Sequence, residues 1–311
     1  MMSEKLLDIK NLAVHYASGK DTVKAVNGIS FGLEKGESLG LVGETGAGKT
    51  TTALAIMGLV PNPPGKVVNG EILFEGEDLL QTSQADMRKI RGAKISMIFQ
   101  DPMASLNPRK KVEDIIGEGL DIHHKCKNKE ERDEMVKAIL AKVGLAPEHA
   151  TRYPHQFSGG QRQRIGIARA LIMNPKLIIA DECISALDVS IQAQVVNLMK
   201  DIQQETGTAY LFIAHDLSMV KYISDRIGVL HLGHLLETGT TDEIFENPIH
   251  PYTKSLLSAI PTPNPIVEKT RSAESYDYAT SGIDYTLGTE HHVGGTHYVK
   301  CTDEELAKWN V

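Results

Sequence analysis

The octapeptide GETGAGKT, residues Gly43–Thr50, follows the short apolar run SLGLV. It matches the pattern G-x-x-x-x-G-K-[ST] at every fixed position. In this pattern the glycines let the backbone curl around phosphate groups, and the helix behind the loop directs its positive end at them. We expect Lys49 to reach the β- and γ-phosphates of ATP and the Thr50 hydroxyl to ligate Mg²⁺. The residues expected to bind the nucleotide are Gly43, Glu44, Thr45, Gly46, Ala47, Gly48, Lys49, Thr50 and Thr51.

Three further apolar, partly β-branched runs occur along the chain, and each ends at a polar residue. They are ISMIF before Gln100, KLIIA before Asp181 and YLFIA before His215. Continuous apolar character indicates strands that are buried on both faces, as in a parallel sheet covered by helices. Amphipathic stretches lie between the runs, so the predicted fold class is α/β. Because ligands of such sheets bind beyond the carboxyl ends of the strands, these polar residues should share one site with the loop.

Two adjacent carboxylates, Asp181 and Glu182, follow the third of these four runs. Adjacent residues that leave a strand point in opposite directions, so we expect them to have different roles. Asp181 should hold Mg²⁺, directly or through water, and Glu182 should orient and polarise the attacking water. His215 could donate a hydrogen bond to the γ-phosphate, although a histidine at a strand end is more often structural. Gln100 could contact Mg²⁺ or the attacking water, but a polar residue that closes a strand is common.

A second glycine-rich turn, FSGGQ at Phe157–Gln161, precedes an apparent helix in which Ile165, Ala168 and Ile172 form an apolar stripe. The turn could be a simple helix N-cap with a glycine-rich start. A cap requires neither two glycines nor the glutamine, which favours a second anion site. Because Gly43–Thr50 already serve the chain's own nucleotide, the second phosphate should belong to another molecule. The residues expected to bind it are Ser158, Gly159, Gly160 and Gln161.

Composition limits the classes of protein to which the chain can belong. Its 311 residues are enough for a sizeable core, and a formal net charge of −7 does not support a broad electrostatic contact with nucleic acid. We see no signal-peptide pattern, and no apolar run approaches the roughly 20 residues that a membrane-spanning helix needs. Cys126, Cys183 and Cys301 are odd in number and widely separated, which is typical of a reduced cytoplasmic protein. Any membrane role is therefore expected to come from a partner.

Taken together, these motifs resemble the ATPase subunits of ABC transporters. The resemblance spans roughly residues 5 to 260 and rests on Gly43–Thr50, Gln100, Phe157–Gln161, Leu177–Glu182, Ser185–Asp188 and His215. SGGQ resembles the signature motif of that family, which usually has Leu where this chain has Phe157. In the family, two subunits sandwich two ATPs head to tail, each ATP lying between one Walker A loop and the signature of the other subunit. The resemblance thus implies that the second glycine-rich turn serves the neighbour's ATP.

The resemblance also implies a P-loop NTPase fold with a mostly parallel core sheet, an N-terminal antiparallel β subdomain and a helical subdomain. It implies an ATPase domain over residues 1–260, with the helical subdomain inserted at about 101–165, and a C-terminal extension over 261–311. Tyr16 would stack on adenine, although an ordinary strand aromatic explains it equally well. Asp188 would belong to the loop that crosses the dimer interface. Gln100 and the helical subdomain would meet the transmembrane subunits.

Three segments are similar to the ATPases of oligopeptide, dipeptide and nickel importers. They are QDPMASLNP at Gln100–Pro108, ALDVSIQAQVVNLM at Ala186–Met199 and NPIHPYTKSLLSAIP at Asn247–Pro261. The similarity implies a peptide as the substrate class, with nickel or another small solute as the alternative. It implies as partners a second, non-identical ATPase subunit, two transmembrane permease subunits and, through them, an external peptide-binding protein. The implied location is the cytoplasmic face of the cell membrane.

Two other classes of ABC protein stay open at this point. A soluble ABC ATPase that acts on DNA or the ribosome usually has two cassettes, a long coiled-coil insertion or a basic contact surface. This chain has one cassette, no long heptad array and an acidic balance, so we expect no nucleic acid partner. An exporter ATPase would have the same motifs, and only the importer-like segments and the tail argue against it.

The chain departs from the family pattern at Cys183 and in its tail. Cys183 stands where the family commonly has proline, and we expect a tolerated small residue rather than redox control. The tail from Thr262 to Val311 resembles the family only loosely. It contains one cysteine, so it cannot supply the four thiolates of an iron–sulfur centre, as some subunits of this group do. A metal site is conceivable, but we expect a solvated histidine-rich segment; the residues concerned are His291, His292, His297 and Cys301.

Overall fold

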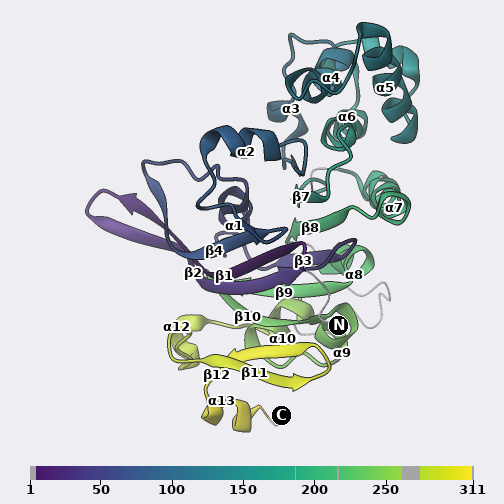
Figure 1. Cartoon of the computed structure of the whole chain (residues 1–311). Helices are drawn as coiled ribbons and strands as arrows, with labels where there is room; N and C mark the ends of the chain where they lie inside the picture. The colour runs from purple at the N-terminus through teal and green to yellow at the C-terminus, as the bar shows by residue number, and fades with distance from the viewer. Residues whose placement is uncertain (1–4, 186, 216, 261–273, 310–311) are drawn as a thin grey trace.

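The computed structural model describes residues 5–185, 187–215, 217–260 and 274–309. Ala186, in the segment predicted to cross a dimer interface, lies outside them. Two β-sheets and a group of helices make up the molecule (Figure 1). Within the described ranges, no helix combines the length and the apolar character that crossing a bilayer would need.

The larger sheet has eight strands in the order β11-β12-β10-β9-β3-β8-β7-β6. Five neighbouring strands are parallel: β3 (Ser38–Val42), β6 (Ile95–Ile98), β7 (Leu177–Asp181), β8 (Ala209–Ala214) and β9 (Arg226–His231). Leu177 and Ile179 of β7 belong to one apolar cluster, whereas Ile178 and Ala180 belong to another. Both faces of the strand are therefore covered, and the predicted α/β class with a mostly parallel sheet is confirmed.

The smaller sheet is antiparallel and has the order β2-β1-β4-β5, as predicted for the N-terminal part. Its strands are β1 (Leu7–Ser18), β2 (Asp21–Leu33), β4 (Gly65–Phe74) and β5 (Glu77–Asp78). Ile9 of β1 is opposite Phe31 on one side and Ile72 on the other, and all three side chains are buried. They share one apolar cluster with Ala53 and Ile56 of α1 (Lys49–Ile56), so this sheet packs against the helix behind the glycine-rich loop.

Helices occupy most of the segment between β6 and β7. They are α3 (Pro102–Ser105), α4 (Val112–Ile122), α5 (Lys129–Lys142), the short helices η1 (Pro147–Thr151) and η2 (Pro154–Gln156), and α6 (Gly159–Leu171). Figure 1 shows α4, α5 and α6 together at the top, away from β11 and β12 at the bottom. The predicted stripe of α6 and its C-cap, Ile165, Ala168 and Ile172, is buried. The division of the chain into an ATPase domain, an inserted helical subdomain and an extension stays a prediction.

The C-terminal tail corrects the expectation of a solvated histidine-rich segment. β11 (Thr289–Gly294) and β12 (His297–Cys301) form a hairpin, and β12 pairs with β10 (His234–Thr240) at Glu237 and Thr238. His297, Val299 and Cys301 alternate along β12 and are all buried, because every second residue of a strand faces the same side. Among the described residues, no three His, Cys, Asp or Glu side chains are grouped so that they could hold a metal ion.

The remaining helices are short, apart from α7. They are α2 (Gln84–Ile90), α7 (Val189–Thr206), α8 (Leu217–Ile223), α9 (Thr241–Glu246), α10 (Pro251–Ser258), α12 (Tyr278–Ser281) and α13 (Asp303–Lys308). α10 contributes Tyr252 to the cluster that also contains Val42 of β3 and Val229 of β9. The segment that follows the parallel strands in sequence thus packs directly beside the strand that leads into the glycine-rich loop.

Candidate functional site

The loop Gly43–Gly48 lies between β3 and α1 and needs glycine at two positions for steric reasons. Gly43 has φ 146, and a Cβ there would lie 2.0 Å from the Leu230 carbonyl oxygen. Gly48 has φ 104, and a Cβ there would lie 2.4 Å from the Ala25 carbonyl oxygen. Both residues also adopt positive φ values, which glycine tolerates at little cost. The loop is therefore closely surrounded by backbone at its two ends and has the strand–loop–helix setting that the sequence predicted.

The Lys49 side chain turns back onto the loop. Its Nζ donates hydrogen bonds to the carbonyl oxygens of Gly43 at 2.6 Å and Glu44 at 2.9 Å, and the residue is 4% exposed. Burial lowers the pKa of the Lys49 ammonium, while the nearby charges of Glu182, Asp181 and Glu44 act in the opposite direction. A buried cation that is satisfied only by carbonyl oxygens can exchange them for the more strongly charged oxygens of a phosphate.

Thr50 and Asp181 meet across the end of β7. The Thr50 Oγ1 donates to Asp181 Oδ1 at 3.1 Å, although the residues are 131 positions apart. Burial raises the pKa of the Asp181 carboxyl, as does Glu182, whereas the hydrogen bond from Thr50 and the charge of Lys49 lower it. A hydroxyl and a largely buried carboxylate form the oxygen donor set that Mg²⁺ prefers, and a cation here would stabilise the ionised carboxylate. The residues therefore fit a magnesium ion.

Glu182, Gln100 and His215 come together from three neighbouring strands. Gln100 Nε2 donates to Glu182 Oε2 at 2.7 Å, and His215 Nδ1 lies 3.6 Å from the same oxygen. Glu182 adopts φ 44, a left-handed conformation that costs roughly 1 kcal/mol for a residue with a Cβ. The Glu182 side chain contacts Gln100 and His215, whereas that of Asp181 contacts Thr50, so the adjacent carboxylates have different partners, as expected. The structure brings all three predicted catalytic side chains to the carboxyl edge of the sheet.

The turn before α6 corrects one step in the sequence interpretation. Ser158 Oγ accepts from the Gln161 amide at 3.3 Å, and Gln161 Oε1 accepts from the Ser158 amide at 3.0 Å. This reciprocal capping box uses the glutamine, so the prediction that a cap does not require it is wrong here. Gly160 also has a packing reason, because a Cβ there would lie 2.7 Å from Ile191 Cγ2. Gly159 has no such constraint, and both it and Ser158 are exposed. Their role toward a second nucleotide stays a prediction.

Two other predicted residues lie on separate elements. Tyr16 is on β1 in the smaller sheet, and a Cβ at Gly65 would lie 2.6 Å from its Cε1, so the ring packs over that glycine. Asp188 is the exposed N-cap residue of α7, and no side-chain hydrogen bond from it caps the helix. Whether Tyr16 stacks on adenine and whether Asp188 reaches a second subunit stay predictions.

Sequence reasoning missed one contact of the glycine-rich loop. The backbone N–H of Glu44 donates to the hydroxyl of Tyr252 at 3.0 Å, across 208 positions of sequence. Tyr252 belongs to the segment NPIHPYTKSLLSAIP, which entered the interpretation only through its similarity to importers. No local pattern marks a tyrosine in the first turn of a helix as a partner of a distant loop.

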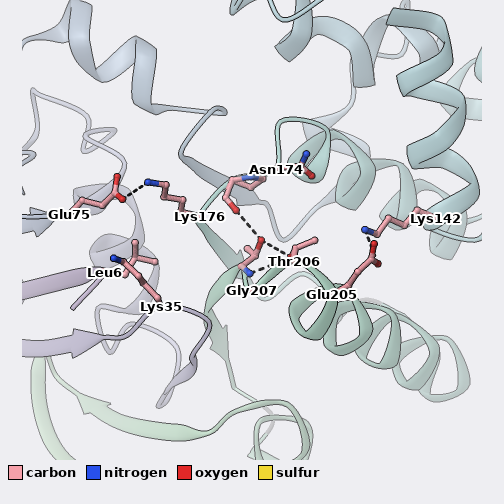
Figure 2. A pocket seen from close by; sticks show the side chains of 11 residues that line it. Leu6, Lys35, Glu75, Lys142, Asn174, Lys176, Glu205, Thr206 and Gly207 are labelled. Carbon is pink, nitrogen blue, oxygen red and sulfur yellow. Dashed lines mark hydrogen bonds and ion pairs between the residues drawn. The ribbon is translucent and has the colours of Figure 1, made fainter. Parts of the chain in front are cut away.

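A cavity of about 780 Å³ lies at the opposite edge of the large sheet (Figure 2). It is lined by residues that precede β3, β7 and β8, including Lys35, Lys176 and Thr208. Figure 2 shows Lys176 beside Glu75 and Lys142 beside Glu205, so these lysine charges are paired with carboxylates. In parallel sheets ligands bind at the carboxyl edge. The loop Gly43–Gly48, at the carboxyl edge, therefore stays the predicted nucleotide site rather than this cavity.

Comparison with known proteins agrees with this geometry. Residues 26–185 match the family described as ABC transporter, and residues 236–282 match the one described as oligopeptide/dipeptide transporter, C-terminal region. The oligopeptide transport ATP-binding protein OppF of Bacillus subtilis (strain 168) is 56% identical over 306 residues, covering 98% of this chain and 99% of that protein. The dipeptide transport ATP-binding protein DppF of Lactococcus lactis subsp. cremoris (strain MG1363) is 54% identical, covering 97% and 96%. The similarity therefore reaches into the tail, further than the motifs alone indicated.

Two solved structures share the fold. A dimeric ATP-binding cassette, determined in a post-hydrolysis state with ADP and Pi, has a TM-score of 0.69 and 27% identity, covering 76% of this chain and 98% of that chain. The protein cbiO1 of Clostridium perfringens, described as part of an ABC transporter complex, has a TM-score of 0.67 and 26% identity, covering 79% and 92%. Each of the two solved chains is matched over almost its whole length, whereas about a fifth to a quarter of this chain is left unmatched.

Proposed function

The chain belongs to the ABC transporter ATPases of the oligopeptide/dipeptide group, and from this premise we propose that it hydrolyses ATP with Mg²⁺ to drive the import of peptides. The observation that carries the proposal is the gathering of Thr50, Asp181, Glu182, Gln100 and His215 beside the glycine-rich loop. These side chains come from four separate segments of the sequence, since only Asp181 and Glu182 are adjacent, yet all of them lie at one edge of the sheet.

The glycine-rich loop, together with Lys49, Thr50 and Asp181, would bind the triphosphate and its magnesium ion. Lys49 would release the carbonyl oxygens of Gly43 and Glu44 and donate to the β- and γ-phosphate oxygens instead. Thr50 and Asp181 would hold Mg²⁺, which supplies positive charge to the phosphate oxygens when it is bound. The dipole of α1 would add favourable electrostatics, because the N-terminus of this helix begins at Lys49. The remaining predicted loop residues, apart from Glu44, whose backbone N–H donates to the Tyr252 hydroxyl, would bind mainly through backbone N–H groups.

Glu182 would accept a hydrogen bond from the attacking water and so aim its oxygen at the γ-phosphate. In the present structure Glu182 instead accepts from Gln100, so Gln100 would have to give up this contact or share the water. His215, whose side chain is 52% exposed and lies next to Glu182, would donate to the γ-phosphate. The three side chains then have separate tasks at one reacting bond.

The signature turn would serve a second subunit. Ser158 and Gly159 are exposed at the start of α6, and Asp188 is exposed at the start of α7. A head-to-tail dimer would place these residues against the ATP bound by the neighbour. The related cassette described above as dimeric supports this arrangement. Closure of such a dimer is a ligand-driven rigid-body movement that attached membrane subunits can follow.

The remaining parts of the proposal rest on the resemblance of the sequence to peptide importers. The proposed partners are a second, non-identical ATPase subunit, two permease subunits and, through them, an external peptide-binding protein. The subunit would lie at the cytoplasmic face of the membrane. The relatives are named for oligopeptide and dipeptide transport, so a peptide is the proposed substrate. We also propose the division into an ATPase domain over 1–260, with the helical subdomain at about 101–165, and an extension over 261–311.

The Glu182→Gln variant tests the catalytic assignment. We expect it to bind ATP with Mg²⁺ about as tightly as the wild type and to hydrolyse it at least about 100-fold more slowly, the usual loss when a general base is removed. Glu205→Gln is the matched control, because Glu205 is an exposed carboxylate on α7 that pairs with Lys142. This variant should keep wild-type turnover, since exposed ion pairs contribute little. Near-normal turnover of Glu182→Gln would remove Glu182 from the proposed role.

The same variant reports on the dimer. With ATP and Mg²⁺, light scattering of Glu182→Gln should give twice the monomer mass if two identical chains can enclose the nucleotides. A protein that binds ATP and stays monomeric would show that a different ATPase subunit is required, in agreement with the proposed non-identical pair. Binding of ATP itself is followed separately by titration with a fluorescent analogue.

A further inference from the structure

We propose that Tyr252 is a positioning residue for the ATP site and that the C-terminal tail holds it in place. The inference rests on the proposed nucleotide site at Gly43–Thr50. It is carried by three contacts: the Glu44 amide donates to the Tyr252 hydroxyl, the Tyr252 ring stacks on His231, and His231 contacts Tyr285 of the tail. The proposed catalytic mechanism does not use the side chains of Tyr252, His231 or Tyr285.

The hydroxyl of Tyr252 fixes one peptide group of the loop. The peptide between Gly43 and Glu44 is planar, so its carbonyl oxygen and its N–H point in opposite directions. Lys49 donates to the Gly43 oxygen on one side at 2.6 Å, and the Glu44 N–H donates to the Tyr252 hydroxyl on the other at 3.0 Å. When Lys49 turns to a phosphate, the Gly43 oxygen loses its hydrogen bond from Lys49. The hydrogen bond from the Glu44 N–H to the Tyr252 hydroxyl then remains to hold this peptide group. Tyr252 therefore fixes the start of the loop while the nucleotide is bound.

Tyr252 is itself held firmly at the start of α10. It is 1% exposed, and its backbone N–H donates to His250 Nδ1 at 3.0 Å, which caps the helix. The backbone N–H groups of Ile249 and His250 both donate to the buried Glu237 carboxylate, at 2.8 and 3.0 Å. His297 Nε2 lies 2.7 Å from the same carboxylate. Glu237 lies on β10, and its carboxylate thus connects the residues before α10 with His297 of β12 in the tail.

The ring of Tyr252 is packed against His231, and His231 contacts the tail. The two rings stack with centroids 4.0 Å apart and planes inclined by 17°. His231 Nδ1 lies 2.7 Å from the Tyr285 hydroxyl, which lies 3.0 Å from the Tyr276 hydroxyl. Tyr276 and Tyr285 belong to the tail. A continuous series of contacts therefore runs from Tyr276 through His231 and Tyr252 to the loop.

The first experiment compares Tyr252→Phe with Tyr210→Phe in the full chain. Both tyrosines are 1% exposed, but within the described part of the chain the Tyr210 hydroxyl has no hydrogen-bond partner. We expect Tyr252→Phe to weaken binding of a fluorescent ATP analogue, and to raise KM for ATP, by about fivefold with little change in kcat. This is the effect of one ordinary hydrogen bond. Tyr210→Phe should leave both constants unchanged.

Urea unfolding of the same variants distinguishes positioning from a structural role. If Tyr252→Phe lowers only the stability and binds ATP as Tyr210→Phe does, the proposal is wrong. Lys49→Ala separates this failure from a failure of the site itself. If Lys49→Ala abolishes binding while Tyr252→Phe has no effect, the site is correct and Tyr252 does not position it. If Lys49→Ala binds normally, the nucleotide site is elsewhere and both proposals fall.

A double-mutant cycle tests the part played by the tail. Tyr285→Phe removes the hydroxyl next to His231 and should weaken ATP binding in the same direction as Tyr252→Phe, but by less. If the tail acts through Tyr252, the double variant should bind about as weakly as Tyr252→Phe alone, because residues joined in one network, here through His231, are not additive. Fully additive losses, or no loss for Tyr285→Phe, would overturn the role of the tail.

Discussion

Burial determines the reactivity of the three cysteines. Burial raises the pKa of Cys183 to about 12 and that of Cys301 to about 11, so both thiols stay protonated at neutral pH. Burial also raises the pKa of Cys126, but this residue is only partly buried, and its Sγ lies 3.7 Å from Met135 Sδ. This burial favours Cys183 as a small apolar residue beside the predicted catalytic carboxylate, and its lack of a redox role stays a prediction.

This difference predicts selective labelling. At about pH 8, a disulfide reagent that detects thiolates should react with one thiol of the folded protein quickly, and with all three after unfolding in urea. The fast thiol should disappear in Cys126→Ser, which serves as the control. Rapid labelling of Cys183 in the folded protein, detected by mass spectrometry of peptides, would contradict the inert role.

At the scale of single residues, the sequence predicted the contacts that follow from a strand end. Thr50 and Asp181, and Gln100 and Glu182, are far apart in the chain, but parallel strands bring their carboxyl ends to one edge. It did not predict that Gln161 closes its own helix cap, because a capping box and a phosphate-binding turn use the same residue types. Geometry alone distinguishes the two uses.

At the scale of elements, the N-terminus of α6 has a control within the same chain. Ser83 caps α2 by accepting from the Asp86 amide, just as Ser158 caps α6 by accepting from the Gln161 amide. Both serines are exposed. Replacing either one removes an N-cap, which costs about 1 kcal/mol of stability. Ser83 also donates to the Asp86 carboxylate at 2.7 Å, but the loss of the N-cap is common to both substitutions.

We expect Ser158→Arg to leave ATP binding by the monomer intact but to prevent the ATP-dependent dimer, since a long cation would fill the space of the neighbour's phosphates. If two identical Glu182→Gln chains form the dimer with ATP and Mg²⁺, light scattering should detect no dimer for Ser158→Arg in this background and a normal one for Ser83→Arg. If ATP binds more weakly to the monomer of Ser158→Arg than to that of Ser83→Arg, the turn is not a site for a neighbour's nucleotide.

For whole elements, continuous apolar runs predicted the four strands that end at the site, because each strand is buried on both faces. The two strands of the tail were not predicted, because their sequence lacks a clear apolar pattern. β11 and β12 are short and carry histidine, threonine and glycine, so their alternation is weak beside their polar composition. Only pairing with β10 reveals that His297 and Cys301 face a buried side.

At the scale of the whole molecule, the buried His250 at the start of α10 and the partly buried His234 of β10 couple folding to pH. Burial lowers the pKa of His250 to about 3 and that of His234 to about 4, so both stay neutral in the folded chain. The ordinary pKa is 6.5. Above it, neither state carries the charge, and stability is independent of these groups. Between 6.5 and about 3, only the unfolded chain takes up the proton on His250, so the free energy of unfolding falls as pH falls.

This dependence of the free energy of unfolding on pH predicts the effect of His250→Asn at acidic pH. Asparagine can still cap α10, but it does not titrate, so the variant lacks the proton uptake of the unfolded histidine. One proton corresponds to about 1.4 kcal/mol per pH unit, so the decrease in the free energy of unfolding from about pH 6.5 to 5 should be smaller by on the order of 2 kcal/mol. Urea unfolding at several pH values measures this slope, whatever the stability of the variant at neutral pH.

The control is His124→Asn. His124 is exposed and has φ 52, a conformation that asparagine also adopts readily. His234 should leave a residual slope in both variants. Equal slopes for His250→Asn and the wild type would mean that His250 is not held neutral, and that the segment joining the tail to the ATP site opens to solvent before the chain unfolds.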